Sequence, residues 1–131
     1  MARLLVVSPV FVLFLSVVSA WSQQMNEPDS PCAGVVVTSD SVECLGKAKA
    51  VSEAKLKALY EEVKQKLEPN EVRQLAKAQE LWSKYREANC SAERELYWPG
   101  TADGPAYLAC LESMARARIK ELRITYAVRL K

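Results

Sequence analysis

Leu75–Cys90, with the sequence LAKAQELWSKYREANC, is the stretch that decides the predicted fold. It contains no Gly or Pro and is rich in residues of high helix propensity, so it predicts a helix. Its apolar side chains continue on two adjoining stripes at helical spacing. Because an apolar surface this wide suits two partners, we predict that this is the central helix of three. The first stripe contains Ala78, Leu81, Tyr85, Ala88 and Ala92, and the second contains Leu75, Trp82 and Cys90.

Helical periodicity on both sides of this stretch, over Val42–Leu67 and Leu108–Tyr126, supplies the two partners. Asp40 and Glu43 have the spacing of a capping box, so we expect the first helix to begin there, with the neighbouring Ser and Thr residues as alternative caps. The positions expected to face inward from this helix are Leu45, Ala48, Leu56, Leu59, Tyr60, Val63 and Leu67.

Proline and glycine mark the connections between the helices. Pro69 suits the first turn of a new helix, which predicts a tight hairpin at Glu68–Pro69 and a second helix that ends near Leu96. The break at 98–105 contains two Gly and two Pro, and a third helix is expected from about Pro105 to Val128. Upstream, Cys32–Thr38 is expected to be an extended strap with at most a few residues of strand. The predicted fold class is all-α, an antiparallel three-helix bundle.

The N-terminal residues are typical of a secretory targeting segment. Arg3 provides a positive start, Leu4–Val18 is mostly apolar, and Val18-Ser19-Ala20 is a small-residue cleavage site. A retained membrane anchor is the alternative, but the apolar run is short for a spanning helix. Lipid attachment requires a Cys directly after the cleavage site. Because Trp21 stands there, lipid attachment is not expected. We predict a signal peptide over 1–20, a flexible leader over 21–31 and a helical domain over 32–131, in a periplasmic or secreted protein without stable membrane insertion.

The expected mature part contains all four cysteines, Cys32, Cys44, Cys90 and Cys110. An even number in a chain sent to an oxidising compartment predicts two disulfides. A zinc site is the alternative, but the sequence has no His and no closely spaced Cys pair. Cys90 lies nearly level with both Cys110 and Cys44 in an antiparallel bundle, so spacing leaves more than one connectivity open. We favour Cys32–Cys44 and Cys90–Cys110, because each would close a local connection.

The segment from Gln79 to Cys90, QELWSKYREANC, resembles the central motif of the lysozyme inhibitor LprI-like family of small secreted bacterial proteins with four cysteines. The first-helix pattern from Leu56 to Leu67 and the pattern from Cys110 to Leu122 are similar to those of the family, and the likeness covers about Cys32–Leu122. The chain departs from the family pattern at Lys57 and Ala115, where Asn and Thr are usual. The resemblance implies a protein that binds and blocks lysozyme.

The residue inventory predicts no catalysis and no cofactor. Without His there is no Ser-His or Cys-His pair, disulfide formation removes thiolate chemistry, and no Gly-rich phosphate loop is present. Without Arg3 the chain has 17 Lys and Arg against 16 Asp and Glu, a net charge of +1. No nucleic acid is expected as a partner, and the oligomeric state is left open. Since many lysozymes are strongly cationic, this net charge offers them no long-range steering.

Two candidate partner-binding regions follow from the sequence. The first is the loop carrying Tyr97 and Trp98, two adjacent aromatics on a Pro- and Gly-rich connection next to the expected Cys90–Cys110 bridge. The alternative is that Trp98 covers the end of the bundle. The second is a polar and aromatic patch of Gln79, Trp82, Arg86 and Glu93 on the second helix, together with Arg118 from the third. Its alternative, which we favour, makes Trp82 a core wedge between helices with an Arg pairing a carboxylate across it.

The basic segment Arg116–Lys131 could touch an anionic envelope surface, although cations near a helix C-terminus are also favoured by the helix dipole. The sequence therefore supports two hypotheses. One is a non-catalytic secreted lysozyme inhibitor, and the other is an envelope interaction module that does not inhibit lysozyme.

Overall fold

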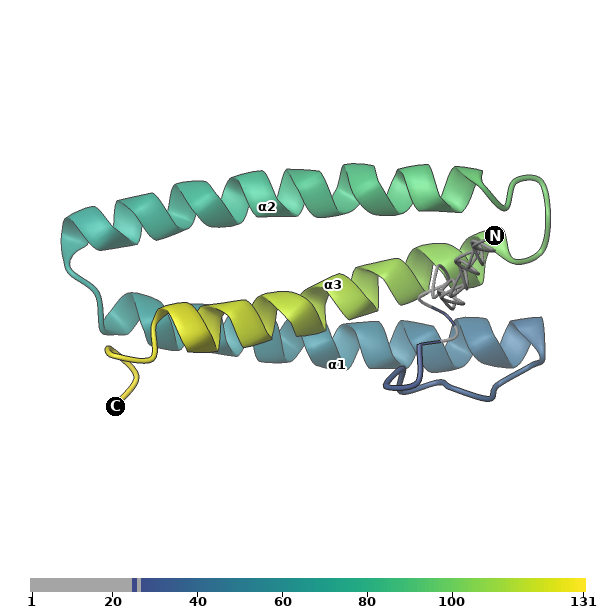
Figure 1. The fold of residues 1–131 in the computed structure, drawn as a ribbon, viewed down its shortest axis with the longest axis horizontal. Coiled ribbons are helices and arrows are strands. Elements are labelled where there is room, and N and C mark those ends of the chain that lie inside the picture. Colours follow the sequence, from purple (N-terminus) through teal and green to yellow (C-terminus); the bar gives the residue numbers. More distant parts are fainter. Residues whose placement is uncertain (1–24, 26) are drawn as a thin grey trace, which may run out of the picture.

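Three antiparallel helices form the part of the chain that the structure describes (Figure 1). The computed structural model describes Met25 and residues 27–131, so the predicted signal peptide and five of the eleven residues of the predicted leader lie outside the described residues. Helix α1 spans Thr38–Gln65, α2 spans Pro69–Glu95 and α3 spans Asp103–Thr125. The described residues contain no strand, which leaves the strap as a run of turns and extended backbone. The all-α prediction is confirmed.

The first helix begins differently from the prediction. Val37 is the residue before α1, no side chain caps the helix, and the expected capping box of Asp40 and Glu43 does not form. Glu43 instead forms an ion pair with Lys47 one turn later. A capping box forms at α2, where the Glu68 amide donates to Glu71 Oε2 over 2.9 Å. Glu can cap through a longer side chain, which a search for Ser, Thr, Asp or Asn at the N-cap overlooks.

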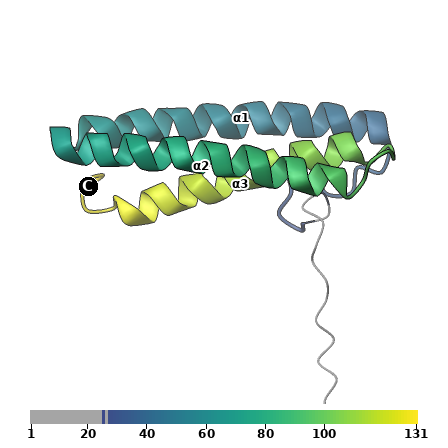
Figure 2. The ribbon, with the colours of Figure 1, turned by 90° about the horizontal axis from the view of Figure 1, so that it is seen from above.

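The central position belongs to α3, which corrects the prediction that α2 packs against two partners. Helix α3 packs along both α1 and α2, whereas α1 and α2 make little contact with each other. Figure 2 shows α3 running at an angle to the other two helices and passing behind α2. Only the second stripe of α2 faces the bundle. The first stripe is solvent-exposed, with Leu81 at 57% and Tyr85 at 61% relative exposure.

The main core cluster joins all three helices. Its buried members are Leu56, Leu59, Val63, Leu75, Ala115 and Leu122, with Trp82 partly buried against them. All seven inward positions predicted for the first helix are buried or half-buried. Both favoured disulfides are present, with Cα atoms 6.0 Å apart for Cys32–Cys44 and 5.5 Å apart for Cys90–Cys110. The first fastens the strap to α1, and the second fastens the end of α2 to the start of α3.

Candidate functional site

Trp82, Arg86 and Arg118 come together inside the bundle. The guanidinium carbons of Arg86 and Arg118 lie 5.5 and 5.7 Å from the Trp82 ring centroid. Both arginine side chains are largely buried, with 12% and 8% relative exposure. Trp82 thus has two cations against its ring in the interface of α2 with α3, an arrangement that stabilises the packing.

The two arginines have partners for their charge. Arg86 donates from Nε and Nη2 to the Leu111 carbonyl over 3.1 and 2.6 Å, and from Nη2 to Glu53 over 2.8 Å. Arg118 donates to Gln79 over 3.1 Å and pairs with Glu121 over 2.8 Å. Burial raises the pKa of Glu53, but hydrogen bonds from Arg86 and Lys49 outweigh it, so the pKa lies below its ordinary value.

A buried ionic network, which the sequence reasoning missed, crosses from α1 to α3. The Glu112 carboxylate is almost completely buried and accepts from Ser52 Oγ over 2.8 Å and from Arg116 Nε over 2.9 Å. Arg116 also binds Asp29 over 2.7 Å and Glu27 over 3.4 Å. The spacing of Glu112 and Arg116 on one helix face was a signal that could have been found. Ser52 lies 60 residues away, and no local pattern connects it to Glu112.

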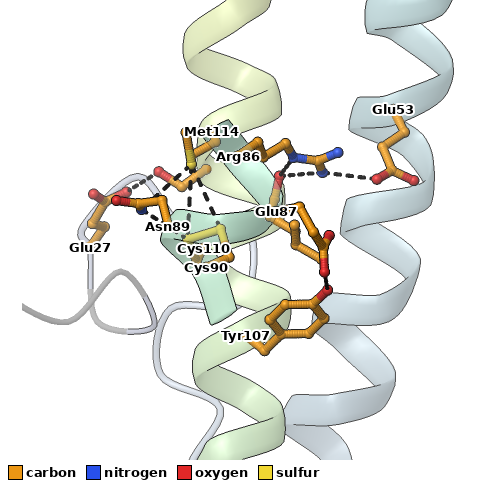
Figure 3. The surroundings of a disulfide bond; sticks show 11 residues. Glu27, Glu53, Arg86, Glu87, Asn89, Cys90, Tyr107, Cys110 and Met114 are labelled. Atoms are coloured by element: carbon orange, nitrogen blue, oxygen red, sulfur yellow. Dashed lines mark hydrogen bonds and ion pairs between the residues drawn. A yellow bond between two sulfur atoms is a disulfide. The ribbon is translucent and has the colours of Figure 1, made fainter. Parts of the chain in front are cut away.

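The surroundings of Cys90–Cys110 join α2 firmly to α3 (Figure 3). Asn89 Nδ2 lies 3.7 Å from both Cys110 Sγ and Met114 Sδ, so its amide faces a cluster of sulfur atoms. On the other side, the Tyr107 hydroxyl donates to Glu87 over 2.6 Å. This hydrogen bond to the carboxylate raises the pKa of Tyr107.

The loop between α2 and α3 holds the other predicted residues, Tyr97 and Trp98, at one end of the bundle. Trp98 is 64% exposed and its neighbour Leu96 is 80% exposed, whereas Tyr97 is half-buried. Backbone bonds tighten the loop, with the Gly100 amide donating to the Tyr97 carbonyl over 2.7 Å. Arg94 pairs with Asp103 over 3.0 Å across its base. The loop is therefore a fixed, partly apolar surface.

The two predicted regions lie in different environments. The structure joins Trp82, Arg86 and Arg118 within the bundle and leaves Trp98 open to solvent. Among the described residues, no group of three His, Cys, Asp or Glu side chains could hold a metal ion. None of the described helices has the length and apolar character needed to span a membrane.

Comparison with known proteins gives one match. A family model described as lysozyme inhibitor LprI matches residues 32–122. This range includes both disulfides and all of the three helices except the last residues of α3. No curated protein and no solved structure matches the chain.

Proposed function

The chain belongs to the lysozyme inhibitor LprI family, and we propose on that premise that it is a non-catalytic binding protein that blocks lysozyme outside the cytoplasm. The family match is the observation that carries the proposal. Two disulfides are consistent with an oxidising compartment, since such bonds form and persist there. An inhibitor of this kind needs a rigid contact surface and no chemistry of its own.

We propose that the α2–α3 loop makes the contact. Trp98 and Leu96 expose apolar surface, and exposed aromatic side chains on a rigid support are typical of residues that dominate binding energy. The loop begins and ends on helices that Cys90–Cys110 joins, so little order has to be gained on binding. Trp82, Arg86 and Arg118 are assigned a supporting role, because both guanidinium groups already have partners within the bundle and Trp82 packs against them.

A lysis assay on cell-wall substrate tests this proposal. Protein with both disulfides formed is titrated against several lysozyme types, beside the variant Tyr97→Ala/Trp98→Ala and the control Leu81→Ala/Tyr85→Ala. The control removes two exposed side chains, one aliphatic and one aromatic, from the outer stripe of α2. We expect saturable inhibition that only the loop variant loses.

Other outcomes would redirect the assignment. Inhibition lost only in the control would move the contact to the outer stripe of α2. If there is no inhibition at tens of micromolar, roughly the weak end of specific binding, the lysozyme proposal fails for the enzymes tested. The exposed stripe of α2 would then favour the second candidate function, an envelope interaction module. Its partner would be identified as envelope material that binds the wild-type protein but not the Leu81→Ala/Tyr85→Ala variant.

A further inference from the structure

The strap and the α2–α3 loop lie at the same end of the bundle (Figure 1), and both carry exposed apolar side chains. We name this surface the strap–loop end and define it by Val35, Val36, Val37, Leu96 and Trp98. Val36 is 89% exposed and Val37 is 53% exposed, beside the exposed Leu96 and Trp98 of the loop. Exposed apolar groups gathered in one region mark an interaction surface.

A groove of about 260 Å³ lies between the strap and the root of the loop. Val35 and Val36 line it from the strap, Leu45 from α1, and Ala102 and Pro105 from the start of α3. Each disulfide fixes one part of this end, since Cys32–Cys44 holds the strap on α1 and Cys90–Cys110 holds the helices that carry the loop. Both parts of the surface are therefore rigid before any partner arrives.

Charge indicates which kind of partner fits. The antiparallel topology places residues 27–51 and 83–114 in the half of the bundle nearer the strap–loop end. This half has nine Asp and Glu against five Lys and Arg, a formal net charge of −4. The opposite half, residues 52–82 and 115–131, has seven Asp and Glu against twelve Lys and Arg, a formal net charge of +5. The near-neutral total conceals a strong separation of charge along the bundle.

Two carboxylates near the strap–loop end add negative charge that is not neutralised locally. Asp40 and Glu95 are exposed and form no ion pair with any described residue. Glu93 and Glu27 approach each other, and burial together with this repulsion raises the pKa of Glu93. An apolar surface with a negative surround complements a cationic protein and attracts it over long range.

We infer that the strap–loop end is a docking face for a cationic protein, in which Val36 and Trp98 make the apolar contact while Asp40 and Glu95 orient the approach. The inference rests on the proposed function and deepens it, because it adds the strap to the contact surface and names the charge of the partner. The charge separation provides the steering that the net charge does not, since the acidic end would face the partner and the basic end would face away.

Association kinetics with a cationic lysozyme test the role of charge. The variant Asp40→Asn/Glu95→Gln and the control Glu62→Lys both change the net charge by +2, and Glu62 is an exposed residue of the opposite half. At low ionic strength we expect the association rate to fall about threefold in the double variant and to change much less in the control. The difference should disappear at high salt. Equal effects in the two proteins would overturn the inference.

A second pair of variants tests the apolar contact. Val36→Ser should raise the dissociation rate roughly fivefold, because it removes apolar surface from the interface. Val128→Ser, at an exposed position of the opposite half, should leave this rate unchanged. An unchanged rate for Val36→Ser would exclude the strap from the contact surface.

A further experiment, which does not depend on lysozyme, distinguishes failure of the inference from failure of the proposed function. If the wild-type protein binds no lysozyme, the proposed function fails for that enzyme, and a decalysine peptide replaces it as the cationic probe. Backbone NMR shifts on titration should then be concentrated in 27–51 and 83–114. Shifts spread evenly over the bundle, or no shifts, would overturn the docking face.

Discussion

At the scale of single residues, Trp82, Arg86 and Arg118 explain why the sequence left two interpretations of this face open, a recognition patch and the favoured alternative of a core wedge between helices. Arg86 and Arg118 lie on helix faces that also carry Trp82, and a linear pattern cannot show whether such a face meets solvent or another helix. The deciding partners are distant in sequence. Leu111 offers a carbonyl 25 residues from Arg86, and Glu53 lies 33 residues away on α1.

Arg86→Lys should destabilise the protein without weakening inhibition. Lys cannot reproduce the fork that reaches both the Leu111 carbonyl and Glu53, so we expect a loss of about 1–2 kcal/mol in the free energy of unfolding. Urea denaturation measures this loss. The control Arg73→Lys, at an exposed position, should change stability by less than about 0.5 kcal/mol. A folded Arg86→Lys protein that no longer inhibits would instead place this side chain in the contact.

Glu93→Gln should stabilise the protein at neutral pH. Burial, with repulsion from Glu27 as a smaller cause, raises the pKa of Glu93 above its ordinary value of 4.5. The folded protein therefore holds this proton more tightly than the unfolded chain, so the ionised carboxylate is unfavourable above the raised pKa, and the penalty disappears as pH falls below 4.5. We expect a higher Tm for the variant at pH 7 and an equal Tm near pH 4, measured by circular dichroism. A lower Tm at pH 7 would contradict this prediction.

At the scale of elements, the two apolar stripes of α2 have different environments although the sequence gives them equal weight. Leu75 is 1% exposed and belongs to the main core, whereas Leu81 is 57% exposed. The helical period predicts which residues share a stripe, and this part of the prediction is confirmed. It cannot predict which stripe meets α3, because that depends on how the third helix crosses the other two.

Leu75→Ala and Leu81→Ala should differ widely in stability. The first empties a fully buried position and is expected to cost about 2–5 kcal/mol. The second truncates an exposed side chain and should change stability by less than about 0.5 kcal/mol. Chemical denaturation of the two variants in parallel makes the comparison, in which the same substitution on the same helix provides the control. A large loss for Leu81→Ala would mean that its stripe is covered in solution.

At the scale of the whole molecule, the bundle, its connections and its disulfides could be predicted because they depend on helical period, Gly and Pro positions and local loop closure. The polar interior could not, because Glu112 meets Ser52 only after α1 and α3 pair. The separation of charge between the two ends of the bundle could not be predicted either, because the net charge of the chain is close to zero. It arises because the helices alternate in direction and so bring acidic residues from separate segments to one end.

Helix α2 should be the first helix to open when its bridge is removed. Its only buried residues are Leu75 and Cys90, and it makes little contact with α1. In the variant Cys90→Ala/Cys110→Ala, we therefore expect hydrogen exchange to show lower protection in 83–95 than in α1 and α3. The chain-entropy model also gives a global loss of about 3 kcal/mol for this 20-residue separation, so the three helices must be compared within one protein.

The other disulfide provides the control for that experiment. Cys32→Ala/Cys44→Ala opens a shorter connection, with a separation of 12 residues, and should also cost about 3 kcal/mol, but it releases only the strap. Protection in α2 should then stay comparable with that in α3. Equal protection of all three helices in the Cys90→Ala/Cys110→Ala variant would contradict the prediction. It would mean that the bundle opens as one cooperative unit and that packing against α3 holds α2 in place without the disulfide.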